Sequence, residues 1–285
     1  MAISNSILEI ILELNSRGYF KNKKSVIDMG DQDININYDD LVELFKQGNF
    51  DFSESEFDPA KKFPLRPRVP SSSLWDAIGF KTKNRMDIIE IERKKKVGKV
   101  IKHDLNLPFN DEDHLNKYDL VTDFGNNEHP FNVYETYKTM HNLCANKGNL
   151  IIYNSIFGGN GFYNFDLSYF ENIAAVNEYS IIFSKLFFID NDKYISTPVN
   201  KDLLKLINLN NIENIYAFYF MRKNSDNNFK IPYQGYGSNF PAKDVYKLQT
   251  INKYISPEKY YIPTKAEDMS GRELLKILIK KIIKR

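Results

Sequence analysis

The sequence predicts an α/β fold: a doubly wound, mostly parallel sheet of seven strands with helices on both faces and an antiparallel hairpin at one edge. Three observations predict it. Residues 118–153 follow the order strand, polar turn, helix, glycine turn, strand, which is the repeating unit of a parallel sheet. Short apolar runs at 24–29, 86–91 and 100–105 have the length of buried strands. A strand, a helix and a strand between 181 and 221 then indicate an antiparallel edge.

Composition places the chain among globular proteins. Its 285 residues are 42% hydrophobic and 27% charged, which suffices for a large domain, expected over 1–222, with an irregular extension over 223–285. The net charge is only +2, from 39 basic and 37 acidic side chains, so no global field favours a nucleic-acid partner. The single cysteine, Cys144, excludes an internal disulfide, and we interpret it as a small core residue rather than a nucleophile.

The start of the chain predicts an amphipathic helix rather than an export signal. Glu9 and Glu13 interrupt its apolar run, and no basic leader precedes it. The side chains expected on its buried face are Ile3, Ile7, Ile10, Ile11 and Leu14. No run approaches the ~18 apolar residues that span a bilayer, so we expect a cytoplasmic protein.

The stretch 49–73 is rich in proline, serine and charge and has no steady period, which predicts a long loop or lid. Ser73 is predicted to cap a short helix that Gly79 ends. The elements expected further along are a strand opening at 150–153, a helix at 167–176, a strand at 181–189, a turn-rich segment at 190–198, a helix at 201–207 and a strand at 214–221.

The end of the chain predicts a basic amphipathic helix, which Ser270 and Glu273 begin as a capping box. A helix of this kind can lie on an anionic membrane through 271–285, where a lipid-linked glycan precursor would be found. Alternatively, its apolar face packs on the domain or on a second copy of the chain, which would make a homo-oligomer.

Four predicted strand ends carry acids, at Asp28, Glu90, Asp104 and Asp123. The carboxyl ends of parallel strands meet at one edge of the sheet, where ligands bind. Carboxylates at this edge suit ligand hydroxyl and amino groups, which would donate charge-assisted hydrogen bonds to them. For Glu90 and Asp104 taken alone, a solvated strand end is the competing interpretation, and for the turn at 28–33 it is an ordinary strand-to-helix turn.

The turn at 28–33 has one glycine, Gly30, and lacks the second and third glycines of the dinucleotide pattern GxGxxG. Asp31 and Asp33 would also repel a phosphate. NAD is therefore disfavoured, and a cofactor that carries a cation is favoured.

Among four histidines, His129 is the best candidate for catalysis. It follows Glu128 in a polar turn and precedes Pro130, which is expected to begin a helix of about fifteen residues, so the imidazole is predicted near a helix N-terminus with a lowered pKa. A neutral imidazole can accept a proton from a hydroxyl group at neutral pH. The competing interpretation is a histidine hydrogen-bonded within the turn. His141 is interpreted as structural, and no pair of histidines has metal-ligand spacing.

Several segments resemble class I S-adenosylmethionine-dependent methyltransferases, in particular a bacterial branch associated with surface polysaccharide genes. The similarity spans 24–190, and its strongest pieces are DLN at 104–106, GNNEH at 125–129 with the following Phe131 and Asn132, and GFYNF at 161–165. The resemblance implies a Rossmann-like methyltransferase fold and S-adenosylmethionine as the cofactor.

The resemblance also implies individual roles. The residues that it places on the cofactor are Asp28 with Gly30 for the methionine part, Glu90 for the ribose, Asp104 with Leu105 for the adenine, and the backbone of Asp123 and Phe124 for the amino acid end. Those predicted to line the acceptor pocket are Asn160, Tyr163 and Asn164.

The function predicted is methyl transfer from S-adenosylmethionine to an oxygen or nitrogen of a small acceptor, a sugar or another component of a surface glycan. His129, helped or oriented by Glu128, is the predicted base that removes the acceptor proton. Two other classes stay open. A methyltransferase-like assembly or adaptor protein that has lost catalysis would explain the sparse glycine loop, and a nicotinamide-dependent dehydrogenase is disfavoured by the missing glycines.

Overall fold

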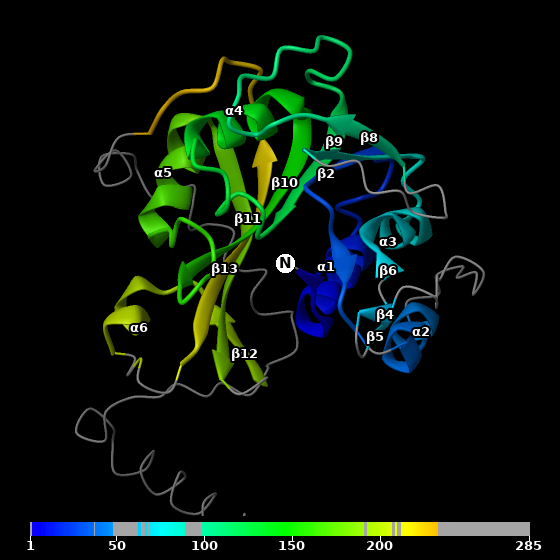
Figure 1. The fold of residues 1–285 in the computed structure, drawn as a ribbon, viewed down its shortest axis with the longest axis vertical. Helices are drawn as coiled ribbons and strands as arrows, with labels where there is room; N and C mark the ends of the chain where they lie inside the picture. The colour runs from blue at the N-terminus through cyan, green and yellow to red at the C-terminus, as the bar shows by residue number, and fades with distance from the viewer. Residues whose placement is uncertain are drawn as a thin grey trace, which may run out of the picture.

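An eight-stranded sheet forms the centre of the protein (Figure 1). The computed structural model describes residues 2–36, 38–47, 62–63, 66–67, 69–88, 98–190, 193–206, 209 and 212–232. The strands, in spatial order, are β12 (Lys193–Pro198), β11 (Tyr179–Asp190), β13 (Asn214–Lys223), β10 (Cys144–Phe157), β9 (Tyr118–Phe124), β2 (Ser25–Met29), β7 (Thr82–Asp87) and β8 (Lys99–Lys102).

Five neighbouring strands, β8, β7, β2, β9 and β10, are parallel. β13 lies antiparallel between β10 and β11, and β12 pairs antiparallel with β11 at the edge. The chain begins this sheet at β2, builds outward through β7 and β8, and then returns to the other side of β2 with β9. The order therefore reverses between β2 and β9, and in doubly wound sheets the ligand crevice lies beyond the carboxyl ends of the strands at such a point.

The predicted doubly wound, mostly parallel fold is confirmed, with eight strands in place of seven. The additional strand is β12, whose sequence KYISTP was assigned to a turn-rich segment. Asp, Asn and Pro in the sequence at 190–198 are weak strand formers by themselves, but its last six residues pair with β11, where Ile195 lies opposite Phe188. Long-range pairing decides the structure of this edge rather than local propensity.

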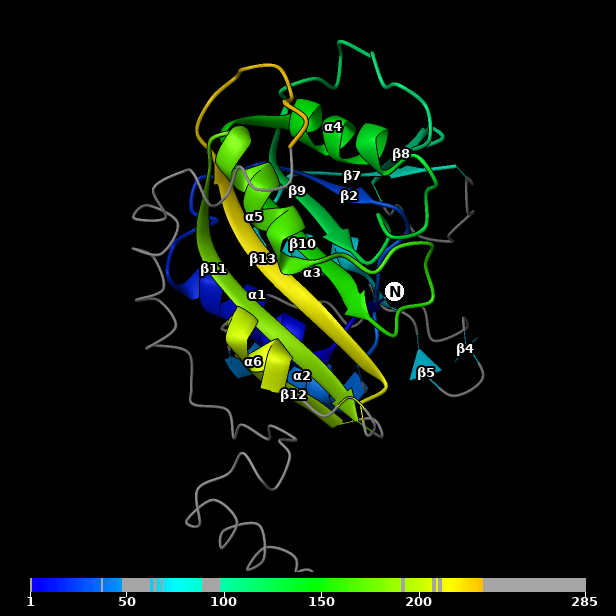
Figure 2. The same ribbon diagram turned by 90° about the vertical axis from the view of Figure 1, so that its left-hand side faces the viewer.

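Helices cover both faces of the sheet (Figure 2). On one face α1 (Asn5–Ser16), α2 (Tyr38–Gln47) and α3 (Ser71–Ile78) contribute to one apolar core, and on the other face α4 (Val133–Leu143), α5 (Leu167–Val176) and α6 (Lys201–Leu206) contribute to a second. The sheet separates the two cores because successive side chains of a strand point to opposite faces. In β10, Ile151 belongs to the first core and Ile152 to the second.

The amphipathic helix at the start of the chain is confirmed as α1, with Ile7, Ile10, Ile11 and Leu14 buried as expected. Ile3 is also buried, but it lies in β1 (Ala2–Ile3) rather than in the helix. β1 pairs in parallel with β3 (Asp33–Ile34), which follows β2, and β6 (Val69–Pro70) completes this small sheet. The start of the chain therefore packs against the segment that follows the Gly30 turn.

The predicted loop at 49–73 contains three short strands among its described residues. β4 (Lys62–Phe63) and β5 (Arg66–Pro67) pair with each other, and β6 belongs to the small sheet. The helix α3 then begins at Ser71 with Pro70 as its N-cap, so the predicted cap at Ser73 is wrong. Ser71 Oγ instead donates a hydrogen bond to Asp28 at 2.5 Å. Gly79 ends the helix in the left-handed conformation, as expected.

The helix α4 is shorter than predicted. It has 11 residues and begins at Val133, so Pro130 is not its first residue. Asn132 is the N-cap and accepts a hydrogen bond from Glu135 N. Asn132 is also bonded to Asn106, with its backbone N donating to Asn106 Oδ1 and its side chain donating to Asn106 O. The start of α4 is therefore fixed both by the local cap of Asn132 on Glu135 and by the loop after β8.

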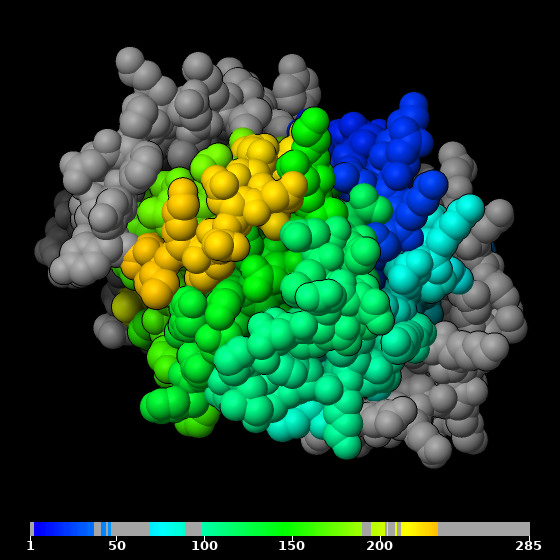
Figure 3. All heavy atoms as spheres, turned by 90° about the horizontal axis from the view of Figure 1, so that it is seen from above, coloured from blue at the N-terminus to red at the C-terminus, as the bar shows by residue number. Residues whose placement is uncertain are grey.

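The strands β7 and β8 end earlier than predicted, at Asp87 and Lys102. Glu90 lies outside the described residues, as do the predicted capping box at Ser270 and the whole helix at 270–285. After β13, residues 224–232 run over the surface, where they are coloured orange in Figure 3. They are held there by hydrogen bonds such as those between Asn177 and Lys230. None of the helices in the described part of the chain is both long and apolar enough to cross a membrane.

Candidate functional site

The ligand site expected where the strand order reverses lies at the turns after β2 and β9. Gly30 ends β2 with φ +81°, a conformation that glycine adopts far more readily than other residues, and its N–H donates to Met86 O at 2.7 Å. Asn126, in the turn after β9, packs directly on Gly30, since a Cβ at position 30 would lie 2.5 Å from Asn126 Oδ1. The two turns are therefore in van der Waals contact, and the contact requires a glycine.

Asp28 lies beneath this turn and is buried. Its carboxylate accepts hydrogen bonds from Ser71 Oγ, from Trp75 Nε1 and from Thr122 Oγ1, so it joins β2 to α3 and β9. Burial raises its pKa to about 6, although these hydrogen bonds act in the opposite direction. The side chain of Asp28 is thus directed into the fold, where its hydrogen bonds to α3 and β9 stabilise the end of β2 that precedes Gly30.

Asp123, near the end of β9, is also fully buried. One carboxylate oxygen accepts from the backbone N–H groups of Asn126 and Asn127 at 2.8 and 3.1 Å, and the other accepts from Asn154 Nδ2 at 2.5 Å. Burial raises its pKa to about 6. The side chain of Asp123 therefore shapes the polar turn, while Phe124 is buried in the core that contains α1.

Glu128 is the most unusual acid of the site. Its side chain has no exposed surface, Oε2 accepts from Ser155 N at 2.8 Å, and Oε1 has no hydrogen-bond partner among the described residues. His129 Nε2 lies 3.9 Å from Oε1. Desolvation raises the pKa of Glu128 to about 7, and the nearby Asp123 adds to the rise. A buried carboxyl group that titrates near neutral pH is typical of functional sites.

The raised pKa of Glu128 predicts a pH dependence of stability. Between its ordinary pKa of 4.5 and about 7 the folded state holds the proton that the unfolded state releases, so the free energy of unfolding falls as pH rises through this window. Glu128→Gln cannot ionise, and its amide oxygen can still accept from Ser155 N. We therefore expect the difference in free energy of unfolding, variant minus wild type, to increase by about 2 to 3 kcal/mol between pH 5 and pH 8.

Urea denaturation at the two pH values measures this difference. The matched control is Glu112→Gln, which neutralises an exposed acid and is expected to change the pH dependence little. Equal pH dependence in the Glu128→Gln variant and in wild type would show that Glu128 is ionised in the folded protein across this range.

His129 is half-exposed, with 44% of its side chain accessible. Its pKa is lowered, as expected, but the main cause is desolvation and not a helix N-terminus, because α4 begins four residues later at Val133. His129 N donates to Asn126 O at 3.0 Å within the turn. The imidazole is therefore the accessible member of the pair that it forms with Glu128.

The GFYNF segment packs directly against the GNNEH turn. Tyr163 N donates to Glu128 O at 3.2 Å, and a Cβ at Gly161 would lie 2.5 Å from the same carbonyl oxygen. Tyr163 OH donates to Phe131 O at 2.6 Å. The two segments, more than thirty residues apart in the sequence, thus form one surface around Glu128.

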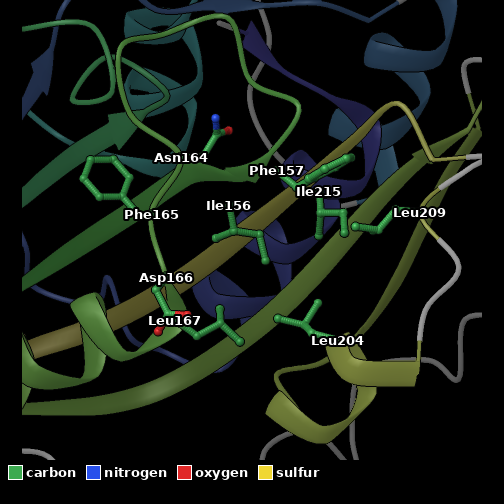
Figure 4. Close-up of a pocket in the computed structure, with 9 residues that line it drawn as sticks. All are labelled: Ile156, Phe157, Asn164, Phe165, Asp166, Leu167, Leu204, Leu209 and Ile215. Atoms are coloured by element: carbon green, nitrogen blue, oxygen red, sulfur yellow. The ribbon is translucent and has the colours of Figure 1, made fainter. Parts of the chain in front are cut away.

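The three residues predicted to line the acceptor pocket, Asn160, Tyr163 and Asn164, lie in the loop after β10 that contains the GFYNF segment. Asn160 is exposed, and Asn164 Oδ1 accepts from Ser155 Oγ and Gly159 N. Asn164 also lines a pocket of about 330 Å³ on the α5 and α6 side of β10 (Figure 4). The other lining residues are mostly apolar: Ile156, Phe157, Phe165, Asp166, Leu167, Leu204, Leu209 and Ile215.

Asp104, predicted to meet an adenine, lies two residues beyond β8 and is partly exposed. Its Oδ1 accepts from the backbone N and the side-chain amide of Asn106, and these bonds lower its pKa. Oδ2 accepts no hydrogen bond from the described residues and remains available to a ligand. Leu105 is buried, and its carbonyl accepts from Thr136 Oγ1 in α4.

Sequence reasoning missed Asn154 and Ser155, which hold Asp123 and Glu128 in place. Both interrupt the apolar run LIIYNSIF of β10. Buried polar groups need partners, so a polar pair at this position is a signal for a hydrogen-bonded site at the strand end.

His141 and Cys144 take structural roles. His141 is buried between Tyr179 OH and Asn227 O, and desolvation lowers its pKa to about 4. Cys144 is buried and its pKa is raised to about 12, so it is a thiol in the core and not a nucleophile. The described residues contain no group of three or more His, Cys, Asp or Glu side chains that could hold a metal ion.

A scan against protein-family models finds no match to this chain, and a search of curated proteins finds none. Similar solved structures do exist. A Bacillus halodurans protein described as a candidate methyltransferase has 9% identity and a TM-score of 0.47, over 78% of this chain and all of that one. A SAM-dependent methyltransferase of Archaeoglobus fulgidus has 16% identity and a TM-score of 0.38, over 76% of this chain and 94% of that one.

A third similar structure is the 1,6-didemethyltoxoflavin-N1-methyltransferase of Burkholderia thailandensis, solved with 1,6-didemethyltoxoflavin and S-adenosylhomocysteine bound. Its identity is 10% and its TM-score 0.40, over 76% of this chain and 77% of that one. The doubly wound assignment of the present chain follows from its own strand order and pairing.

Proposed function

We propose that this protein transfers a methyl group from S-adenosylmethionine to an oxygen or nitrogen of a small acceptor. One observation carries the proposal: a half-exposed histidine, His129, lies 3.9 Å from a carboxyl oxygen of the buried Glu128 that has no hydrogen-bond partner in the described part of the chain, near the reversal of strand order. Two of the motifs that carry the sequence resemblance to methyltransferases, GNNEH and GFYNF, also meet in space around Glu128, which favours one common role for them.

The residues at the crevice fit the cofactor in two respects. Gly30 provides a turn without a side chain at the strand end, and Asp104 offers a carboxylate oxygen to an amino group. Gly30 and Asp104 would therefore hold the two ends of the cofactor, and Asp28 would act by supporting the Gly30 turn. The cofactor supplies an electrophilic methyl group, so the protein has to position the acceptor and remove its proton.

His129 is suited to proton removal because desolvation lowers its pKa below the ordinary 6.5, so the imidazole is neutral at pH 7 and above. With Nε2 directed at Glu128 Oε1, the other ring nitrogen is free to accept the proton of an acceptor hydroxyl or amine. The imidazolium that forms would be stabilised by Glu128 in its ionised form, which prevails above its pKa of about 7.

The acceptor is proposed to be a sugar or another component of a surface glycan, made in the cytoplasm. The sequence resemblance supports this assignment. Tyr163, which is tied to Phe131, and the exposed Asn160 would border the acceptor from the GFYNF loop.

Titration calorimetry of the full chain with S-adenosylhomocysteine tests the proposal. We expect saturable binding of one molecule per chain at sub-millimolar concentration. Absence of binding near 1 mM would contradict methyl transfer, and quenching of protein fluorescence by NADH in the same sample would favour a dehydrogenase.

A further inference from the structure

Exposed apolar side chains gather at the carboxyl edge of the sheet. Among the described residues, four of the six large hydrophobic side chains that are exposed follow the ends of β7, β8, β9 and β10, and they are Ile88, Leu107, Phe131 and Phe162. The two phenylalanines are the most exposed, at 75% and 72%. Exposure of an aromatic ring to water is unfavourable, so two adjacent exposed rings at a ligand crevice indicate a surface that another molecule covers.

Phe131 and Phe162 form one structure although they come from different loops. Their ring centroids are 6.1 Å apart and their planes meet at 85°, so the two rings are nearly perpendicular. This pair of rings is called the corner below. The loops are fastened together by the hydrogen bond from Tyr163 OH to Phe131 O and by that from Tyr163 N to Glu128 O. The position of the corner is thus fixed relative to the Glu128–His129 pair.

The place of the corner in the sheet separates it from the predicted adenosine site. Asp104, which is expected to bind the adenine, follows β8, on one side of β2, whereas Phe131 and Phe162 follow β9 and β10, on the other side. A molecule in the crevice would therefore have its adenosine end away from the corner. The corner lies where the acceptor has to be, because Phe131 is only two residues from His129.

We propose that Phe131 and Phe162 form a platform that binds the acceptor by the apolar face of a ring. This inference rests on the proposed function and narrows its acceptor class. The ring would stack on the phenylalanines and direct a hydroxyl or amino group at His129. A ring with an apolar face is found both in a pyranose, whose C–H groups line one face, and in an aromatic acceptor.

Saturation-transfer NMR on the full chain with S-adenosylhomocysteine tests the platform, with methyl β-D-glucopyranoside and 4-methylphenol as the two ring probes. At least one probe should receive saturation at its ring protons, and we expect this signal to fall at least about fivefold in the Phe131→Ala/Phe162→Ala variant. Phe131→Tyr, which keeps the ring, should retain the signal. The matched control is Ile231→Ala, which truncates an apolar side chain of similar exposure, 69%, far from the site in sequence.

The outcomes separate this inference from the proposed function. Loss of probe signal with unchanged S-adenosylhomocysteine affinity supports the platform, and the identity of the responding probe distinguishes a sugar from an aromatic acceptor. Absence of signal from both probes in wild type, or equal signal in wild type and the double variant, overturns it. Conversion of a dimer to a monomer by the double substitution, measured by sedimentation, would also overturn it by making the corner a subunit interface. If S-adenosylhomocysteine fails to bind while the probes contact the phenylalanines, methyl transfer fails and the ring-binding platform stands.

Discussion

Gly30→Ala is expected to weaken S-adenosylhomocysteine binding by at least about 10-fold, a change of about 1.4 kcal/mol or more in binding free energy. A methyl group at position 30 would lie 2.5 Å from Asn126 Oδ1, so the turns after β2 and β9 would have to separate. The φ of +81° adds a strain of about 1 to 2 kcal/mol for any residue with a Cβ. Calorimetry measures the affinity, and urea denaturation measures the loss of stability.

Gly18→Ala is the matched control for backbone strain. Gly18 has φ +82°, and a Cβ there would have no atom within 4 Å. Its substitution should therefore cost stability by strain alone and leave the affinity unchanged. Adding Asn126→Gly to Gly30→Ala should restore part of the affinity by removing the contact. Wild-type affinity in Gly30→Ala would show that the cofactor does not depend on this turn.

His129→Ala is expected to lower turnover by about 10²-fold or more while cofactor affinity stays within about twofold, because the base acts on the acceptor and not on the sulfonium. The pKa values of the pair also predict the pH profile: wild-type turnover should rise as the imidazole loses its proton, below its ordinary pKa of 6.5, and rise further as Glu128 ionises near pH 7. Steady-state kinetics with labelled S-adenosylmethionine measures both.

Glu128→Gln keeps the shape of the site and removes its buried charge. We expect its turnover to fall as well, since the imidazolium formed on His129 would lose the neighbouring carboxylate. His129→Ala with normal turnover and a normal pH profile would assign His129 to the structure of the turn, and catalysis would then have to be sought elsewhere in the crevice.

The order of the elements could be predicted from the sequence because most strands of the central sheet contain an apolar run. The helix at 167–176 has its predicted bounds, and the strands at 181–189 and 214–221 lie within β11 and β13. Periodicity and length decide such elements, and burial on both faces of the sheet makes the signal strong.

Two of the helix boundaries that failed lie where a polar side chain has a distant partner. Ser71 Oγ donates a hydrogen bond to Asp28 in β2, and α3 begins at Ser71 instead of after a cap at Ser73. Asn132 bonds to Asn106 and caps α4, so the helix starts after Pro130 and not at it. Such choices depend on tertiary contacts that local sequence patterns do not contain.

For the candidate site, the sequence indicated the GNNEH turn and the GFYNF loop but not their arrangement. It identified Glu128 and His129, yet the burial of Glu128 follows from Ser155 and Gly161, which belong to other parts of the chain. Asp28 and Asp123 were predicted at strand ends, and the structure shows that their carboxylates are used within the fold. An acid at a strand end can thus stabilise the backbone of a site through internal hydrogen bonds instead of contacting the ligand.

The structure of the full chain crystallised with S-adenosylhomocysteine tests the central claim most directly. We predict density for one molecule beyond the carboxyl ends of β2 and β9, in contact with Gly30 and with Asp104 Oδ2, and with its sulfur on the side of the crevice that faces His129. Density at another place on the chain, or none at a saturating concentration of the ligand, would contradict the assignment of this crevice as a methyl-transfer site.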